Sequence, residues 1–158
     1  MSAAFAIAPA RTADDIAAVA ELFRAYATSL PVDLGYQRFE DELAQLPGKY
    51  APPSGELLLA RDAQGLAIGC AGLRPLDAER CEMKRLFLSQ AARGLGLGRA
   101  LAQAVIEAAR RSGRRELLLD TLPSMTVAIG MYEVLGFERA DAYYAPTPPG
   151  TIFMRLAL

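Results

Sequence analysis

A glycine-rich segment constrains this chain more than any other feature, because it joins a short apolar run to a stretch with helical spacing. The run ends at Leu88 and the helical stretch continues through Ile106. The segment reads Arg93, Gly94, Leu95, Gly96, Leu97, Gly98 and Arg99. Glycine lets the backbone approach a ligand closely, and a helix start presents free N–H groups and the positive end of the helix dipole. We therefore expect this junction to bind phosphate.

The length and charge of the chain limit its organisation and its partners. With 158 residues and 53% hydrophobic content, residues 1–158 are expected to form one domain with a core that needs no disulfide or metal. The net charge is −1 and the basic residues are scattered, so no nucleic acid is expected as a partner. Residues 1–10 lack a basic leader region and are too short to span a membrane. We expect a cytoplasmic protein with no membrane partner.

Two absences in the composition exclude several kinds of chemistry. The chain has no histidine, so triads and metal sites that use histidine are excluded. Cys70 and Cys81 are too few for a cysteine zinc site. We expect both to be reduced, small core residues, and we expect no metal.

The apolar periodicity predicts strands and helices that alternate irregularly, in a mixed α+β layer structure. Strands are predicted at 5–8, 56–61, 67–74, 81–88, 116–120, 137–144 and 151–158. Helices are predicted from Asp14 or Asp15 to about Leu30, at 37–46, from the glycine segment to about Arg111, and at 124–135. The last helix is expected to stop at Gly136. No repeat or linker divides the chain.

Two other phosphate-binding motifs compete for the glycine segment. A P-loop requires Gly-Lys-Ser/Thr, but Arg99 and Ala100 follow Gly98, so this interpretation fails. A dinucleotide fingerprint requires a third glycine, and Arg99 or Leu101 stands in its place. Asp120 follows at a strand end, where an acid that binds ribose would be expected. A nucleotide-binding oxidoreductase therefore stays an alternative.

The pattern Arg93-x-x-Gly96-x-Gly98 after a strand resembles the pyrophosphate-binding signature of the GNAT superfamily of N-acetyltransferases. Two further features fit in order and spacing: the preceding strand at 82–88, and Tyr132 four residues before a Gly-Phe pair. The likeness extends over about 67–137. It departs from the family at Met125, because the family often has asparagine seven residues before this tyrosine. One side-chain hydrogen bond to the cofactor is therefore expected to be missing.

The resemblance implies a central, mostly antiparallel and splayed sheet flanked by helices. It also implies that acetyl-CoA is the co-substrate, and that residues 93–99 hold its pyrophosphate through backbone N–H groups. The strand before the loop would bulge, and Leu86, Phe87 and Leu88 would bond the pantetheine arm. The implied reaction is direct acetyl transfer to a primary amine of a small molecule or peptide. Similar proteins commonly form homodimers, although nothing in this sequence marks an interface.

Two residues are candidates for the chemistry of transfer. Tyr132 matches the family's proton donor for the departing thiolate, and the alternative is a tyrosine that anchors its helix to the sheet. Glu82 lies where some family members carry a catalytic base, and the alternative is a salt bridge with Lys84 or Arg85. A backbone N–H near Leu88 would polarise the thioester carbonyl.

Other positions keep both a functional and a structural interpretation. Arg93 and Arg99 either pair with phosphates or are solvated. Asp120 and Thr121 either contact the acceptor or cap the next helix, for which Ser124 competes. Candidate wall residues for the acceptor are Tyr26, Leu30, Tyr36, Arg74, Tyr143 and Tyr144. Aromatic residues with one arginine suit a small amine that also carries a carboxylate, or they form ordinary core edge.

The departure at Met125 leaves a second function open. A non-catalytic module that binds acyl-CoA and senses it or regulates a partner would share the same loop. The oxidoreductase alternative would instead bind NAD at this segment. The sequence does not name the acceptor.

Overall fold

The computed structural model describes residues 4–158, except for the side chain of Tyr36. Those residues form seven strands, four α-helices and three short 3-10 helices. In chain order they are β1 (Phe5–Pro9), α1 (Ala13–Ser29), η1 (Leu34–Gln37), α2 (Phe39–Gln45), η2 (Gly48–Tyr50), β2 (Glu56–Asp62), β3 (Ala67–Pro75), β4 (Arg80–Leu88), η3 (Gln90–Ala92), α3 (Leu97–Arg111), β5 (Glu116–Thr121), α4 (Thr126–Val134), β6 (Glu138–Ala140) and β7 (Ile152–Ala157).

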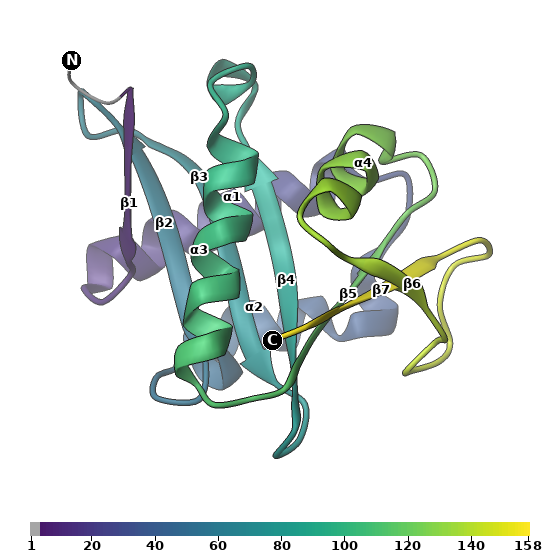
Figure 1. The fold of residues 1–158 in the computed structure, drawn as a ribbon. Coiled ribbons are helices and arrows are strands. Elements are labelled where there is room, and N and C mark those ends of the chain that lie inside the picture. The colour runs from purple at the N-terminus through teal and green to yellow at the C-terminus, as the bar shows by residue number, and fades with distance from the viewer. Residues whose placement is uncertain (1–3) are drawn as a thin grey trace.

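The strands form one sheet in the order β1-β2-β3-β4-β5-β7-β6. All neighbouring pairs are antiparallel except β4 and β5, which are parallel. Figure 1 shows α3 lying across one face of the sheet, with α1 and α2 behind the opposite face and α4 beside the β5–β7 part. The predicted α+β class with a mostly antiparallel sheet is confirmed.

Strand β3 packs closely against both layers, and two glycines make this possible. A Cβ on Gly69 would lie 2.9 Å from Leu97 Cδ2, on the face covered by α3. A Cβ on Gly72 would lie 2.6 Å from the ring of Tyr50, on the face covered by α1 and α2. Real Cβ contacts do not reach such distances, so each glycine lets a side chain of the adjacent layer rest on the strand. Leu97, which begins α3, is thereby fixed against β3.

Strands β4 and β5 separate after a short paired stretch. Residues 80–82 pair with residues 116–118, but β4 continues to Leu88 and β5 to Thr121 without further pairing between them. In Figure 1 the β5–β7 part of the sheet turns away from β1–β4. This is the splay that the resemblance implies. It leaves one edge of β4, over residues 83–88, without a strand beside it.

A bulge interrupts β4 within the splayed stretch. Cys70 of β3 lies opposite Phe87, whereas Gly72 lies opposite Lys84, so β4 has two residues, Arg85 and Leu86, where β3 has one. Arg85 takes the left-handed conformation with φ 60°. An extra residue of this kind bends a strand and disturbs its ladder. The bulge therefore lies next to the edge that β5 leaves uncovered.

The helix boundaries follow local signals that the sequence only partly displayed. Thr12 caps α1 in a capping box with Asp15, so the helix begins one residue before the predicted start. Gly96 precedes α3 with φ 77°, and Gly136 follows α4 with φ 104°. Both are backbone conformations that glycine adopts at little cost.

Three expectations about elements are wrong. The helix predicted at 37–46 divides at Arg38, whose φ of 58° separates η1 from α2. The strand predicted at 137–144 ends at Ala140. Helix α4 begins at Thr126 after Met125, which makes no side-chain cap, so neither Asp120–Thr121 nor Ser124 caps it. Among the described residues, no helix has the length and apolar character needed to cross a membrane.

Candidate active site

A cavity of about 660 Å³ opens where β4 and β5 separate. Its walls come from the end of α1, the bulged half of β4, the glycine loop with the start of α3, the end of β5, and α4. Its lining includes Tyr26, Gln37, Lys84, Arg85, Leu86, Phe87, Leu88, Arg93, Gly94, Gly96, Leu97, Gly98, Arg99, Asp120, Met125 and Tyr132.

The glycine loop forms one end of the cavity, as predicted. Gly94 and Gly96 have φ of 82° and 77°, and no atom lies within 4 Å of a Cβ placed on either. The first N–H groups of α3 have no partner within the helix, and the residues that carry them, Leu97, Gly98 and Arg99, line the cavity. Arg93 and Arg99 are exposed and line the cavity, whereas Leu95 is 44% exposed and does not. The loop thus fits a diphosphate held by main-chain N–H groups between two guanidinium groups.

The bulged half of β4 forms the floor of the cavity. Leu86, Phe87 and Leu88 all line it, on the edge of β4 that β5 does not cover. Backbone N–H and C=O groups on an uncovered edge need hydrogen-bond partners, which water or an extended ligand can supply. An extended amide-containing arm can therefore bond this edge in the manner of an added strand.

Tyr132 lies on α4 and faces the cavity. Tyr132 is only 6% exposed, and the centre of its ring lies 5.6 Å from the centre of the Phe137 ring. Among the described residues its hydroxyl has no hydrogen-bond partner. Burial, with Tyr26 and Asp120 nearby, raises the pKa of the Tyr132 phenol well above its ordinary value. The phenol holds its proton at neutral pH, as a proton donor must before the reaction, and its raised pKa makes it a weaker acid than an exposed tyrosine.

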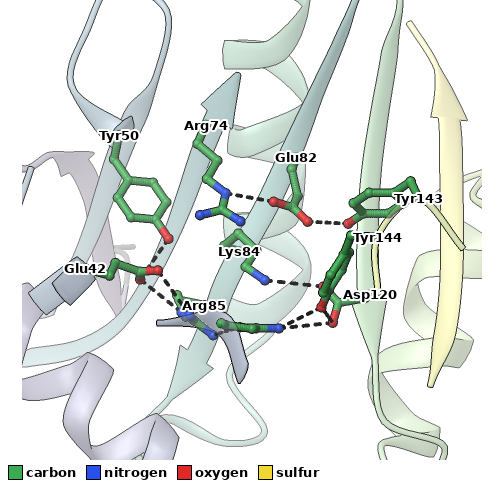
Figure 2. A network of polar contacts seen from close by, with 10 residues as sticks. Glu42, Tyr50, Arg74, Glu82, Lys84, Arg85, Asp120, Tyr143 and Tyr144 are labelled. Carbon is green, nitrogen blue, oxygen red and sulfur yellow. Dashed lines mark hydrogen bonds and ion pairs between the residues drawn. The ribbon is translucent and has the colours of Figure 1, made fainter. Parts of the chain in front are cut away.

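Glu82 and Arg74 lie outside the cavity lining, contrary to the groove position expected for them. The carboxylate of Glu82 is buried, with Arg74 Nε donating to Oε1 at 2.7 Å and the Tyr143 hydroxyl donating to Oε2. Figure 2 shows Glu82 between Arg74 and Tyr143, above Lys84 and Arg85. Glu82 lies on the stretch of β4 that pairs with β5, and its side chain is in contact with Arg74 and Tyr143.

A second polar group joins β4, β5 and the segment after β6 at the inner end of the cavity. Lys84 Nζ lies 3.4 Å from Asp120 Oδ1. The Tyr144 hydroxyl donates to Asp120 Oδ2 at 2.8 Å, and Gln37 Nε2 lies 3.4 Å from the same oxygen (Figure 2). Tyr144, a predicted wall residue, therefore contacts a lining residue without lining the cavity itself.

Arg85 ties the bulge to the helices on the other side. Its guanidinium bonds both carboxylate oxygens of Glu42, at 3.0 and 3.1 Å, and Gln37 Oε1 at 2.6 Å. Its charge lies 5.9 Å from the ring centre of Tyr26, which packs edge-on against Phe87. Burial acts to raise the pKa of Glu42, but Arg85 outweighs it and leaves that pKa below its ordinary value.

The other predicted residues differ in where the structure places them. Leu30 and Tyr26 line the cavity. Tyr143 does not line it, and its hydroxyl donates a hydrogen bond to Glu82. The side chain of Tyr36 lies outside the described part of the structure. Cys70 and Cys81 are buried free thiols, and burial raises the pKa of Cys81 to about 11.

Sequence reasoning missed Lys84 and Gln37 as cavity residues, and it marked Met125 as the position of a missing hydrogen bond to the cofactor. Met125 lines the cavity and accepts a hydrogen bond from the Thr121 hydroxyl at its sulfur, at 3.4 Å. The available signal for Lys84 was its position inside an apolar strand, where a charged side chain requires a partner.

The fold and this cavity define a class of protein, and comparison with known families agrees. Residues 16–137 match the model of the acetyltransferase (GNAT) family. The chain therefore belongs to this family and is an acyltransferase that uses acetyl-CoA. It is 37% identical over 138 residues to an uncharacterized N-acetyltransferase of Schizosaccharomyces pombe, covering 87% of this chain and 85% of that protein.

Solved structures share the fold. An acetyltransferase from Streptococcus agalactiae superimposes with a TM-score of 0.80 at 20% identity, over 98% of this chain and 99% of the other. The Salmonella typhimurium protein yncA, solved with its cofactor acetyl-CoA, superimposes with a TM-score of 0.70 at 20% identity, over 97% of this chain and 93% of the other.

Proposed function

We propose that the protein transfers the acetyl group of acetyl-CoA directly to a primary amine of a small molecule. The supporting observation is that one cavity contains the glycine cradle, the uncovered edge of β4 and the Tyr132 phenol. These are the three parts that diphosphate, pantetheine and leaving thiolate require. In this proposal the cofactor contacts are those expected from the sequence, with Leu95 facing away.

The proposed chemistry has one covalent step and no acyl-enzyme. The amine lone pair attacks the thioester carbon, forming the C–N bond as the C–S bond breaks. The nitrogen gives its extra proton to solvent water, the coenzyme sulfur takes a proton from the Tyr132 hydroxyl, and solvent then returns a proton to the Tyr132 phenolate. A backbone N–H of the uncovered β4 edge, near Leu88, is positioned to stabilise the developing oxyanion. Both cysteines are buried away from the cavity lining, which suits direct transfer.

We propose a structural role for Glu82 rather than the predicted role of base. Both of its oxygens accept hydrogen bonds, from Arg74 and Tyr143, and it does not line the cavity. A bound amine needs no strong base, because a small neutral fraction can react. Glu82 instead fixes the stretch where β4 and β5 remain paired.

Replacing Tyr132 with phenylalanine tests the proposal. Without the phenol proton the thiolate leaves poorly, so kcat for release of CoA should fall about 100-fold or more. The affinity for acetyl-CoA, measured by calorimetry, should be unchanged because the ring and the loop remain. Tyr143→Phe is the matched control, since it removes a buried hydroxyl outside the cavity. Full turnover by Tyr132→Phe with an acceptor would contradict the role of the phenol.

A cytoplasmic location and a homodimer remain predictions from the sequence. The alternative acceptor is the amine of a peptide. Assays of CoA release that compare free amines with peptide N-termini distinguish the two kinds of acceptor.

A further inference from the structure

Lys84 is a buried cation with too few partners. Its side chain is only 4% exposed, on the bulged part of β4 that lines the cavity. An ammonium group carries three N–H donors. Within the described part of the chain, Nζ has one carboxylate contact, 3.4 Å long, and the ring of Tyr144 with its centre at 5.8 Å. Two donors therefore lack an acceptor, which is costly for a buried charge.

Each neighbouring cation has a carboxylate partner closer than the 3.4 Å contact of Lys84, at 2.7 Å for Arg74 and at 3.0 and 3.1 Å for Arg85. Arg74 is paired with Glu82, and Arg85 makes a two-pronged pair with Glu42. Neither glutamate lines the cavity. Lys84 is thus the cation at the inner end whose charge and donors are available to a ligand.

The carboxylate that faces this end of the cavity is already engaged. Asp120 accepts from Tyr144 at 2.8 Å and lies 3.4 Å from both Gln37 Nε2 and Lys84 Nζ. Its lone pairs are directed at protein donors, so a second ammonium group would have to displace them. This end of the cavity therefore offers hydrogen-bond donors that lack an acceptor oxygen. A simple cationic amine or a polyamine cannot supply that oxygen.

We infer that the acceptor is a small amine that carries a carboxylate, such as a free amino acid, and that Lys84 binds this carboxylate. The inference rests on the proposed amine acetylation. A carboxylate oxygen would give Nζ charge-assisted hydrogen bonds at the donors that its 3.4 Å contact with Asp120 leaves without an acceptor. Burial lowers the pKa of Lys84, and the carboxylates of Glu82 and Asp120 act against that shift. Leu30, Val32 and Leu34 line the same cavity, so the side chain of the amino acid is expected to be apolar.

The test compares amino acids with their amides as acceptors. Alanine, valine, leucine, methionine and phenylalanine are each assayed beside the corresponding amide, with CoA release as the readout. An amide lowers the basicity of the neighbouring amine and so raises its neutral fraction, which favours the amide chemically. A preference for the acid must therefore come from binding. We expect kcat/KM to favour the acid by about 10- to 100-fold for at least one pair, as for a hydrogen bond to a charged group.

Variants at the two lysines of the chain test whether Lys84 causes the preference for the acid over the amide. Lys84→Met keeps the length of the side chain without its charge and should abolish the preference, mainly through KM for the acceptor, with acetyl-CoA affinity unchanged. Lys84→Arg should retain it in part. Because Lys84→Met leaves Asp120 unpaired, the double variant Lys84→Met/Asp120→Asn provides a neutral pair if the single variant folds poorly. Lys49→Met is the control, since Lys49 is exposed on η2.

The outcomes separate this inference from the proposed function. Amides that react as well as or better than the acids, or a preference that survives Lys84→Met, would overturn the carboxylate site. Turnover with plain amines such as spermidine but with no amino acid would overturn it too, while leaving amine acetylation in place. A protein that binds acetyl-CoA but acetylates none of these amines would refute both.

Discussion

Individual glycines with the same backbone conformation serve different purposes in this protein. Gly65, in the turn between β2 and β3, and Gly96, at the start of α3, have φ of 83° and 77°. A Cβ added to either glycine would have no atom within 4 Å. Only Gly96 lines the cavity. Substitutions at these two glycines should therefore lower the free energy of unfolding alike, whereas only a substitution at Gly96 should affect a ligand in the cavity.

Gly96→Val should abolish acetyl-CoA binding, because the side chain would occupy the space that the diphosphate requires. The left-handed conformation should also lower the free energy of unfolding by about 1–2 kcal/mol. Gly65→Val should show the same loss of stability in denaturant titrations and bind acetyl-CoA normally in calorimetry. Undiminished affinity in a folded Gly96→Val variant would contradict the assignment of the loop.

The polar cavity residues were harder to predict than the loop. The glycine spacing is local, so the phosphate cradle could be placed from the sequence alone. Lys84 and Asp120 meet only because β4 and β5 run parallel and then separate, and no periodicity encodes that pairing. The sequence left Glu82 open as a base or a salt-bridge residue, and in the structure its carboxylate is buried against Arg74 and Tyr143.

The bulged strand β4 depends on one residue that the sequence did not mark. Arg85 holds φ 60° without being glycine, a conformation that costs about 1–2 kcal/mol. Its pair with Glu42 and its bond to Gln37 connect the bulge to α2 and η1 and offset that cost. The uncovered edge of β4 is thus maintained from the far side of the sheet.

Arg85→Met should lower the free energy of unfolding by about 3–5 kcal/mol, because it leaves the Glu42 carboxylate buried without its cation. The double variant Arg85→Met/Glu42→Gln should lose less free energy of unfolding than the two single variants together, because it leaves no buried charge without a partner at this pair. Chemical denaturation of all four proteins measures this interaction. Strictly additive losses would show that the pair does not act as a unit.

Elements with continuous apolar character were predictable, and those shaped by side-chain contacts were not. The strands at 56–62, 67–75 and 80–88 follow from their own sequences to within a residue or two. The predicted strand after Gly136 stops at Ala140, and the chain beyond it brings the hydroxyls of Tyr143 and Tyr144 to Glu82 and Asp120 instead. Those partners lie in distant parts of the chain.

At the level of the whole molecule, two parts of the sheet are joined directly by only three residue pairs between β4 and β5. A coenzyme in the cavity would contact both parts of the sheet. Because it would bind the folded protein and not the unfolded chain, acetyl-CoA at a hundred times its Kd should stabilise the protein by about 2.7 kcal/mol. Thermal-shift measurements with acetyl-CoA and with NAD test this. A shift with NAD and none with acetyl-CoA would restore the oxidoreductase interpretation.

The cradle at the glycine loop is built from main-chain amides, whereas the opposite end of the cavity is built from side chains such as Lys84, Asp120 and Gln37. A point mutation can exchange any side chain, but only a change to proline removes a backbone N–H. The two halves of the reaction are therefore unequally open to evolutionary change: a new acceptor requires few substitutions, while the choice of acyl donor is carried by the course of the backbone itself.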